Sequence, residues 1–293
     1  MRIERLAVVG VGLIGGSFAA ALKEAGGVGR VVGVGRGRAN LDQALRLGII
    51  DEIASDPALG VRDADFVLLA MPVGQMGTAM AAIAPALAPH AVVTDAGSTK
   101  RDVVANAYAH LASALDRFVP AHPIAGSEKT GAGAAAATLF RDRNVILTPL
   151  AENTEQAVAR VRGAWLACGA RVTEMSAADH DRTLGVVSHL PHVLAFALVD
   201  LVARHRDAER LFALAAGGFR DFTRIASSSP EMWRDICVAN RDALAEVLAT
   251  YRRELDDLTT MLERADAAAL ERLFTRARDA REAWMRGNGG TSS

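Results

Sequence analysis

At 293 residues the chain exceeds what one ordinary hydrophobic core accommodates, so its length predicts two domains. A formal net charge of −1 leaves no electrostatic case for nucleic acid or an anionic membrane as a partner. Cys168 and Cys237 are too few and too far apart for a disulfide framework or a metal knuckle, which favours the cytoplasm. The first residues run directly into strand-like sequence, so no secretory leader is expected.

The first half of the chain alternates short β-branched runs with alanine-rich stretches. This pattern is typical of a parallel sheet flanked by helices. The expected strands cover residues 6–9, 31–34, 66–70, 92–94, 118–121 and 144–148. The expected helices cover residues 13–25, 41–47, 76–87 and 101–114.

The second half changes character after Pro149. Nearly everything from 154 to 285 has helical spacing, so we place a sheet domain at 1–150 and an all-helical domain at 151–293. The run 184–203 has the length of a membrane span, but it contains His189, Pro191 and Asp200. We interpret it as a helix buried between subunits or domains.

A glycine-rich turn follows the first expected strand. Gly10, Gly12 and Gly15 have the spacing of a dinucleotide-binding turn, and an expected helix follows at once. The first glycine allows the turn, the second lets a pyrophosphate approach the backbone, and the third lets the helix pack on the strand. The amino end of that helix offers unpaired N–H groups to phosphate. The remaining predicted cofactor contacts near this turn are Leu13, Ile14, Met71 and Pro72.

The second expected strand ends without the acidic residue that usually binds the ribose of NAD. Arg36 and Arg38 follow it instead, and a guanidinium suits a 2′-phosphate. NADP is therefore favoured, with NAD left open because Gly35 leaves room for it. Two solvated arginines in a loop are the alternative interpretation.

Two polar segments follow neighbouring strands of the expected sheet. The segment 94–100 carries Ser98, and the segment 122–129 begins with His122. Ligands of open α/β sheets bind outside the carboxyl edge, so Ser98 and His122 are expected to meet there. For Ser98 alone, a helix cap is an equally good interpretation. A redox cofactor beside a candidate base indicates an oxidoreductase.

The helical half holds two further polar segments. Spacings of seven and four place Asp181, Ser188 and His192 on one face of a helix, which Pro191 is expected to kink. The second segment begins at Gly217, and its Arg224 offers a bidentate fork to a carboxylate. A histidine satisfied in the core and an intrachain ion pair are the structural alternatives for His192 and Arg224.

Taken in order, these motifs resemble the prephenate dehydrogenase family, with its arogenate and cyclohexadienyl variants. The matching segments are 10–16, 94–100, 122–129, 188–192 and 217–233, which span nearly the whole chain. The resemblance implies a Rossmann-type doubly wound sheet followed by an all-helical domain that forms a homodimer. It also implies oxidative decarboxylation of prephenate or arogenate, a small-molecule substrate, with hydride transfer to NAD or NADP and no metal.

The resemblance also implies a role for each matched residue. His122 would accept the proton of the ring hydroxyl, and Ser98 would hydrogen-bond the same hydroxyl. Arg224 would bind a substrate carboxylate, while His192 and Gly217 would meet the substrate side chain. The last two matched residues, Glu128 and Asp181, would form ion pairs that position Arg224 or control entry.

Two other functions are weighed against this one. A β-hydroxyacid or imine reductase also joins a Rossmann-type domain to a helical one, but it usually relies on a lysine or aspartate there. Residues 151–293 contain no lysine. A non-catalytic dinucleotide sensor would be expected to lack the base or the anion-binding arginine, and both His122 and Arg224 are present.

Overall fold

The structure, a computed structural model, describes residues 2–127 and 129–287. Its contacts divide the chain into two compact units, 1–241 and 242–293. This division differs from the sequence-based one because the helices that precede residue 241 pack with the sheet domain. The boundary near residue 150 stays a prediction.

The first unit contains two sheets. The strands are β1 (Ile3–Val9), β2 (Val28–Val34), β3 (Glu52–Ala54), β4 (Phe66–Leu69), β5 (Val92–Asp95), β6 (Phe118–Val119), β7 (Ala121–Pro123), β8 (Asn144–Leu147) and β9 (Arg171–Glu174). Six parallel strands form one sheet in the order β3-β2-β1-β4-β5-β6, and β7-β8-β9 form a smaller sheet. The order of the large sheet is that of a doubly wound dinucleotide-binding fold, which confirms the predicted fold class.

The helices of the first unit include those expected near 13–25, 41–47, 76–87 and 101–114. The α-helices are α1 (Leu13–Glu24), α2 (Arg38–Arg46), α3 (Pro57–Val61), α4 (Met76–Ile83), α5 (Arg101–His110), α6 (Glu155–Ala167), α7 (Ala177–Leu184), α8 (Leu190–Ala203), α9 (Ala208–Ala213), α10 (Gly217–Thr223) and α11 (Pro230–Ala239). The shorter helical turns are η1 (Val73–Gln75), η2 (Ala84–Ala86), η3 (Ala112–Arg117), η4 (Ala132–Ala134), η5 (Gly185–His189) and η6 (Arg224–Ser227).

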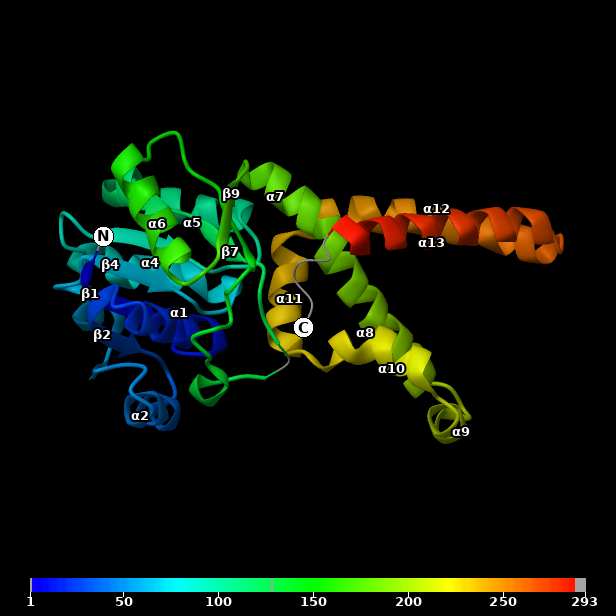
Figure 1. The fold of residues 1–293 in the computed structure, drawn as a ribbon, viewed down its shortest axis with the longest axis horizontal. Coiled ribbons are helices and arrows are strands. Elements are labelled where there is room, and N and C mark those ends of the chain that lie inside the picture. The colour runs from blue at the N-terminus through cyan, green and yellow to red at the C-terminus, as the bar shows by residue number, and fades with distance from the viewer. Residues whose placement is uncertain (1, 128, 288–293) are drawn as a thin grey trace. The chain divides into compact units, whose positions relative to one another are not determined.

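The side chains of β1 alternate between two hydrophobic cores, one on each face of the large sheet. Leu6 and Val8 share one core with α1 and α6, where the rings of Phe18 and Trp165 meet edge to face at 4.6 Å. Ala7 and Val9 face the other core, which α4, α5 and α11 cover (Figure 1). This layering fixes the carboxyl edge of the sheet, where β1, β4 and β5 end.

The smaller sheet corrects two expectations. The strand expected over 118–121 is interrupted at Pro120, so β6 stays in the large sheet and β7 pairs antiparallel with β8. The expectation of helix throughout 154–285 misses β9, a mostly exposed polar strand that pairs with β8. Its side chains do not alternate strictly between buried and exposed positions, so its sequence carries little strand signal.

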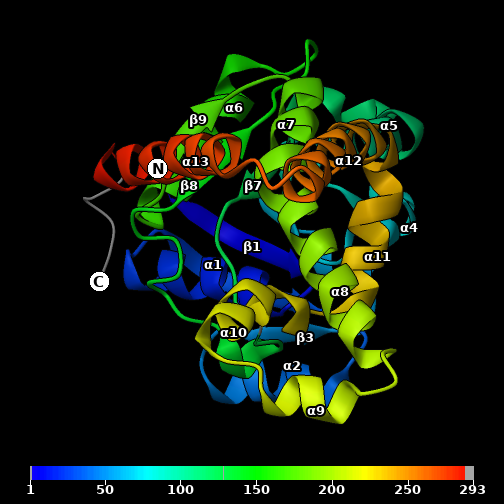
Figure 2. The ribbon, with the colours of Figure 1, turned by 90° about the vertical axis from the view of Figure 1, so that its right-hand side faces the viewer.

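One helical run among the described residues, Ala177–Ala203, is long and apolar enough to cross a membrane, judged by length and composition only. Within the chain, 17% of its most apolar window is buried. The run is not a regular α-helix, because η5 is a π-helical turn between α7 and α8. Beyond α8, the short elements α10 and η6 fold back against it (Figure 2).

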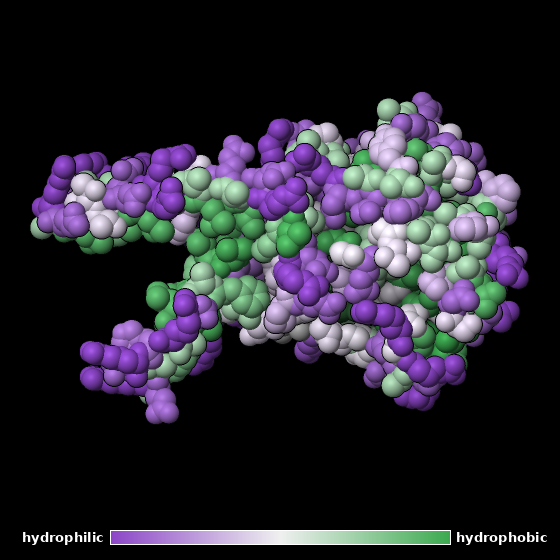
Figure 3. All heavy atoms as spheres, turned by 180° about the vertical axis from the view of Figure 1, so that it is seen from behind, coloured by the Kyte–Doolittle hydropathy of each residue, from purple (hydrophilic) through white to green (hydrophobic). Residues whose placement is uncertain are grey.

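The second unit consists of two long helices, α12 (Arg241–Glu263) and α13 (Ala267–Gly287), joined by a turn in which Ala265 has φ +48°. Large hydrophobic side chains stay exposed on both helices, namely Leu255, Leu262, Phe274, Trp284 and Met285. Figure 3 shows hydrophobic residues gathered along these helices. Such a face normally lies against another protein surface.

Candidate active site

The glycine-rich turn between β1 and α1 has the geometry of a dinucleotide site. Gly10 adopts φ +103°, and a Cβ there would lie 2.5 Å from the carbonyl oxygen of Ala70. A Cβ on Gly15 would lie 2.2 Å from the carbonyl oxygen of Gly10, whereas a Cβ on Gly12 would meet nothing within 4 Å. The first and third glycines are thus required by the fold, and the second opens the space through which a pyrophosphate would approach.

The amino end of α1 completes this turn. Its N-cap, Gly12, supplies no side-chain cap, so the first-turn amides of Leu13 and Ile14 are left to a bound anion. Met71 borders the turn, because its nitrogen would lie 2.9 Å from a Cβ on Gly10, and Pro72 follows it at the start of η1. These residues fit a dinucleotide, but their contacts with it stay predictions.

The two arginines after β2 differ in their surroundings. Arg38 pairs with Asp42 one helical turn ahead, with Nε and Oδ1 2.9 Å apart. Arg36 is exposed beyond the carboxyl end of β2, where the ribose of a dinucleotide lies in this fold class. The structure therefore makes Arg36, rather than Arg38, the candidate for a 2′-phosphate contact.

His122 lies in β7, directly after the residue that Asp95 and Lys100 hold in place. The Asp95 carboxylate accepts the Ala121 amide at 3.0 Å, and the Lys100 ammonium donates to the Ala121 carbonyl at 2.7 Å. Lys100 and Asp95 are fully buried and form an ion pair with each other. Both backbone groups of Ala121 are thus fixed, which sets the position of the His122 ring.

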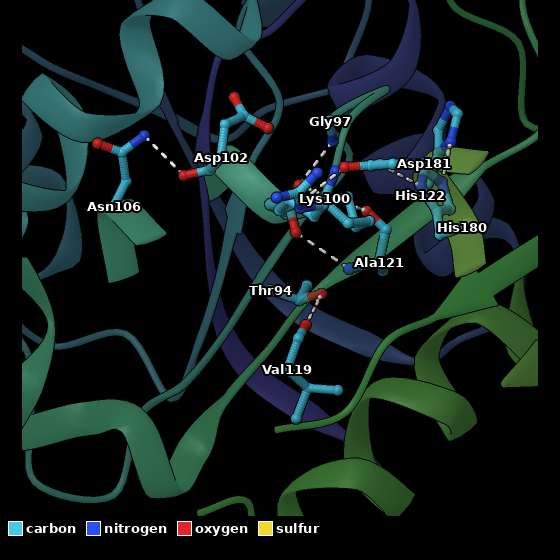
Figure 4. Close-up of polar contacts among 12 residues, drawn as sticks. Thr94, Gly97, Lys100, Asp102, Asn106, Val119, Ala121, His122, His180 and Asp181 are labelled. Carbon is cyan, nitrogen blue, oxygen red and sulfur yellow. Dashed lines mark hydrogen bonds and ion pairs between the residues drawn. The ribbon is translucent and has the colours of Figure 1, made fainter. Parts of the chain in front are cut away.

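His122 forms the outer end of a chain of hydrogen bonds. Its Nδ1 lies 2.8 Å from Nε2 of His180, whose own Nδ1 lies 2.7 Å from the Asp181 carboxylate. Figure 4 shows these three side chains grouped to one side of Lys100. His122 is half-buried, while His180 and Asp181 are buried. Nε2 of His122 has no hydrogen-bond partner among residues 2–127 and 129–287.

The structure gives Asp181 contacts that the sequence did not suggest. Its two carboxylate oxygens accept the amides of Lys100 and Arg101 at 2.8 and 2.9 Å, so they cap the start of α5. The remaining contact of the carboxylate is with His180. Asp181 therefore lies behind the His122–His180 pair, and its role toward Arg224 stays a prediction.

The same environment explains how these groups titrate. Burial, reinforced by the positive charges of His180, Lys100 and His189, holds the pKa of His122 well below its ordinary value. Burial also lowers the pKa of His180, and its hydrogen bond to Asp181 offsets only part of this effect. For Asp181 burial acts to raise the pKa, but hydrogen bonds from His180 and the two amides outweigh it and leave the pKa lowered. His122 is therefore neutral at neutral pH.

His189, in the π-helical turn η5, lies beside this chain. Its Nδ1 lies 3.0 Å from the Asn240 amide nitrogen, which also donates to the Asp181 carbonyl at 2.8 Å. Burial lowers the pKa of His189 to about 4, partly opposed by the Asp181 charge and the Ser98 carbonyl. The Ser98 carbonyl thus lies beside His189, and the expected meeting of Ser98 with His122 stays a prediction. Ser98 does not cap α5, because the N-cap position is Lys100.

The predicted substrate anchors lie on α8, α10 and η6. His192 stacks on Trp233 with ring centroids 3.8 Å apart, and its Nδ1 lies 2.8 Å from the Ser188 carbonyl. Burial lowers the pKa of His192, and the charge of Arg224 lowers it further, so these two predicted residues are neighbours. Gly217 is exposed at the start of α10, where a Cβ would meet nothing within 4 Å.

One expectation about this region changes. Because η5 is a π-helical turn, Asp181, Ser188 and His192 do not lie on one face of a regular helix. Ser188 contacts His192 through its backbone carbonyl. The predicted contact of Glu128 lies outside the described residues, and no group of three or more candidate metal ligands occurs among the residues described.

Several residues of the site have no counterpart in the sequence-based prediction. They are Asp95, Lys100, His180 and Asn240, together with Trp233, which lies in the hydrophobic core and also stacks on His192. His180 stands next to Asp181, and this adjacency of two titratable residues was the one available signal. Its partnership with His122, 58 positions earlier, depends on how α7 packs against α5.

Comparison with known families gives two matches that together cover most of the chain. Residues 18–174 match the description "Prephenate dehydrogenase, nucleotide-binding domain". Residues 176–276 match "Prephenate dehydrogenase, dimerization domain".

Individual relatives agree with these matches. A prephenate dehydrogenase of Bacillus subtilis is 39% identical over 284 residues, 95% of this chain and 76% of the relative. A cyclohexadienyl dehydrogenase of Zymomonas mobilis is 38% identical, covering 95% of both chains. The solved structure of prephenate dehydrogenase from A. aeolicus, in complex with hydroxyphenyl propionate and NAD+, superposes with a TM-score of 0.89 at 35% identity, over 97% of this chain and 99% of that chain.

Proposed function

Because the chain belongs to the prephenate dehydrogenase family, we propose that it oxidatively decarboxylates prephenate to 4-hydroxyphenylpyruvate, or arogenate to tyrosine, in tyrosine biosynthesis. The observation that supports this best is the His122 imidazole, which is neutral and leaves Nε2 without a described partner. It lies at the carboxyl edge of a sheet that carries a dinucleotide-binding turn.

In this reaction NAD(P)+ supplies the acceptor for the hydride that leaves C4 of the substrate ring. His122 Nε2 accepts the proton of the hydroxyl on that carbon, and Ser98 orients the same hydroxyl. Loss of carbon dioxide then restores an aromatic ring and leaves a phenolate oxygen. The substrate loses a hydride and carbon dioxide, and the released product is a phenol. The phenolate must therefore take up the one proton that the hydroxyl gave away. His122 is thus proposed to return the proton that it accepted.

The rest of the site would hold the substrate in place. Arg224 is proposed to bind a substrate carboxylate with its guanidinium fork, close to His192, which would contact the side chain together with Gly217. Such positioning is worth several kcal/mol, up to roughly 7–11 in favourable cases. No chemical role for a metal is needed in this scheme.

The first experiment is a turnover assay of the purified protein with prephenate and with arogenate, each with NAD+ and with NADP+. The expected result is formation of reduced nicotinamide with at least one pair. A protein that turned over neither substrate, but reduced a β-keto acid or an imine, would be a reductase instead. One that bound the cofactor without turnover would be a sensor.

The choice of cofactor depends on Arg36. We propose that its exposed guanidinium favours NADP, and Arg36→Ala is expected to lower kcat/KM with NADP+ roughly 10-fold while leaving NAD+ unchanged. Arg38→Ala is the matched control, because Asp42 already holds that side chain. If Arg36→Ala leaves the ratio of kcat/KM with NADP+ to kcat/KM with NAD+ unchanged, Arg36 does not contact the 2′-phosphate.

The chain is also proposed to act as a cytoplasmic homodimer. The matched dimerization domain covers α8, α12 and about half of α13, and each of these helices keeps large exposed hydrophobic side chains, among them Leu201, Leu262 and Phe274. A second copy of the chain would cover them. Sedimentation of the purified protein tests this assembly.

A further inference from the structure

We propose that His180 and Asp181 form a proton relay behind His122. His180 fixes the tautomer that leaves His122 Nε2 as the base, and Asp181 balances the charge that the pair gains. The inference rests on the proposed function for its chemical step, but the tautomer that it requires exists in the free protein. In this arrangement His180 is a positioning residue, because it acts through His122.

The direction of the hydrogen bonds follows from Asp181. An ionised carboxylate only accepts, so the Nδ1 of His180, 2.7 Å away, must carry a hydrogen. A neutral His180 then has its lone pair on Nε2. The contact of 2.8 Å between that nitrogen and His122 Nδ1 therefore requires His122 Nδ1 to donate. The lone pair of His122 is left on Nε2, the atom without a described partner.

The charges around the relay match this assignment. Facing the two rings are Asp181 from α7, His189 from η5, and Lys100 with Asp95 from the β5–α5 segment. Lys100 and Asp95 form an ion pair and shift the pKa of His180 in opposite directions, whereas at His122 only the effect of Lys100 is felt. His189 is neutral at neutral pH because of burial. With the histidines neutral, the formal charges of Lys100 and Asp95 cancel, and the negative charge of Asp181 remains. One proton accepted by the two histidines brings the formal charge of these groups to zero.

The step needs only two proton transfers. The substrate O–H bond breaks as a proton joins His122 Nε2, and the Nδ1–H bond of His122 breaks as its proton joins His180 Nε2. The positive charge then lies on His180, in contact with Asp181. Both transfers reverse when the phenolate forms, so the enzyme returns to its starting state.

The fold holds the relay rigid from several sides. Asp181 is fixed by the amides that begin α5 and by Asn240, which binds its carbonyl. The Asp95–Lys100 pair clamps the residue before His122. A pair of histidines held only for packing would not need each ring nitrogen aligned on a specific partner.

Two substitutions at one position separate orientation from proton transfer. In His180→Gln the amide oxygen can reach the place of Nε2 and accept the His122 Nδ1–H, but it cannot carry the proton. In His180→Leu both functions are lost. We expect kcat to fall about 10-fold in the first and about 100-fold in the second, with KM for the substrate within about 3-fold. The acid limb of the kcat profile should move to lower pH in both, because Asp181 no longer stabilises the imidazolium.

The matched control is His90→Gln, an exposed histidine outside the site, which should leave kcat and the pH profile unchanged. Binding of hydroxyphenyl propionate checks that each variant keeps its site. In the free wild-type protein, nitrogen NMR should find His122 protonated on Nδ1. If His180→Leu does not fold, the His180→Gln variant and the NMR measurement still test the relay.

Either of two results would overturn the relay. One is a His122 protonated on Nε2 in the free protein. The other is a His180→Gln variant whose kcat and acid limb match those of the wild type. A wild-type protein without turnover of prephenate or arogenate would instead contradict the proposed function. The tautomer of His122 could still be measured in that protein, because the measurement does not need turnover.

Discussion

At His122 the proposed substrate site is bounded by buried groups whose hydrogen bonds are already formed, whereas at Arg224 it is bounded by the exposed starts of short helices. The first end is held by the Asp95–Lys100 pair and by Asp181. The second consists of α10 and η6, in which no residue is buried. The chemical end is therefore preorganised within one chain, a state that favours catalysis. We expect the anchoring end to become buried when it binds its ligand or a second subunit.

The largest expected effect lies at the chemical end. His122→Asn should lower kcat at least about 100-fold, because it removes the general base, while leaving cofactor binding intact. Steady-state kinetics and cofactor titration measure the two quantities. Near-normal turnover would show that the base lies elsewhere. His122 would then no longer mark the chemical end of the site.

A change at the anchoring end should act on binding instead. Arg224→Gln is expected to raise KM for prephenate roughly 10-fold or more with a small change in kcat, since a charged hydrogen bond contributes about 1.5–3 kcal/mol. Arg220→Gln, on the neighbouring helix α10, serves as the control. If KM stays constant and only the melting temperature falls, Arg224 is a structural ion-pairing residue.

The glycine-rich turn allows a sharper test of which positions the fold requires. Gly12→Val should raise KM for the cofactor roughly 10-fold with little change in melting temperature, because its Cβ points into open space. Gly15→Val should destabilise the protein by about 1–3 kcal/mol or more, because its Cβ would meet the Gly10 carbonyl at 2.2 Å. Thermal melts and cofactor titrations distinguish them, and the reverse pattern would contradict the assignment.

The last expected effect concerns stability in acid and is confined to a narrow range of pH. In the unfolded chain His189 binds its proton near the ordinary histidine pKa of 6.5, whereas in the folded protein burial lowers that pKa to about 4. The unfolded state therefore binds more protons between these values, and the free energy of unfolding falls as the pH falls through that window, by on the order of 2–3 kcal/mol. His189→Gln should make this dependence shallower in urea titrations. Equal slopes would show that His189 is solvated.

The part of the fold that the sequence predicts is the part that depends on local patterns. The spacing of Gly10, Gly12 and Gly15 after a β-branched run is a property of neighbouring residues, so the turn and the first strands follow from the sequence. The short elements β3 and α3 do not, because three and five residues carry too little periodicity.

The active site could be predicted only in part. His122 was identifiable as a titratable residue at the end of an expected strand. Its partner His180 and the buried Lys100 were not, because their roles depend on contacts between segments that the chain separates by 58 and 21 residues. Such contacts arise when α7 and α5 pack together, and no local spacing encodes them.

The π-helical turn η5 makes the side chains before it and after it face different neighbours. One additional residue in a helix rotates everything beyond it by about 100°. Before the turn, Asp181 is directed at α5, and after it, His192 is directed at Trp233. Deleting a single residue between 185 and 189 would restore regular winding and misalign these side chains. Chain length in this stretch thus constrains the enzyme as strictly as side-chain identity does.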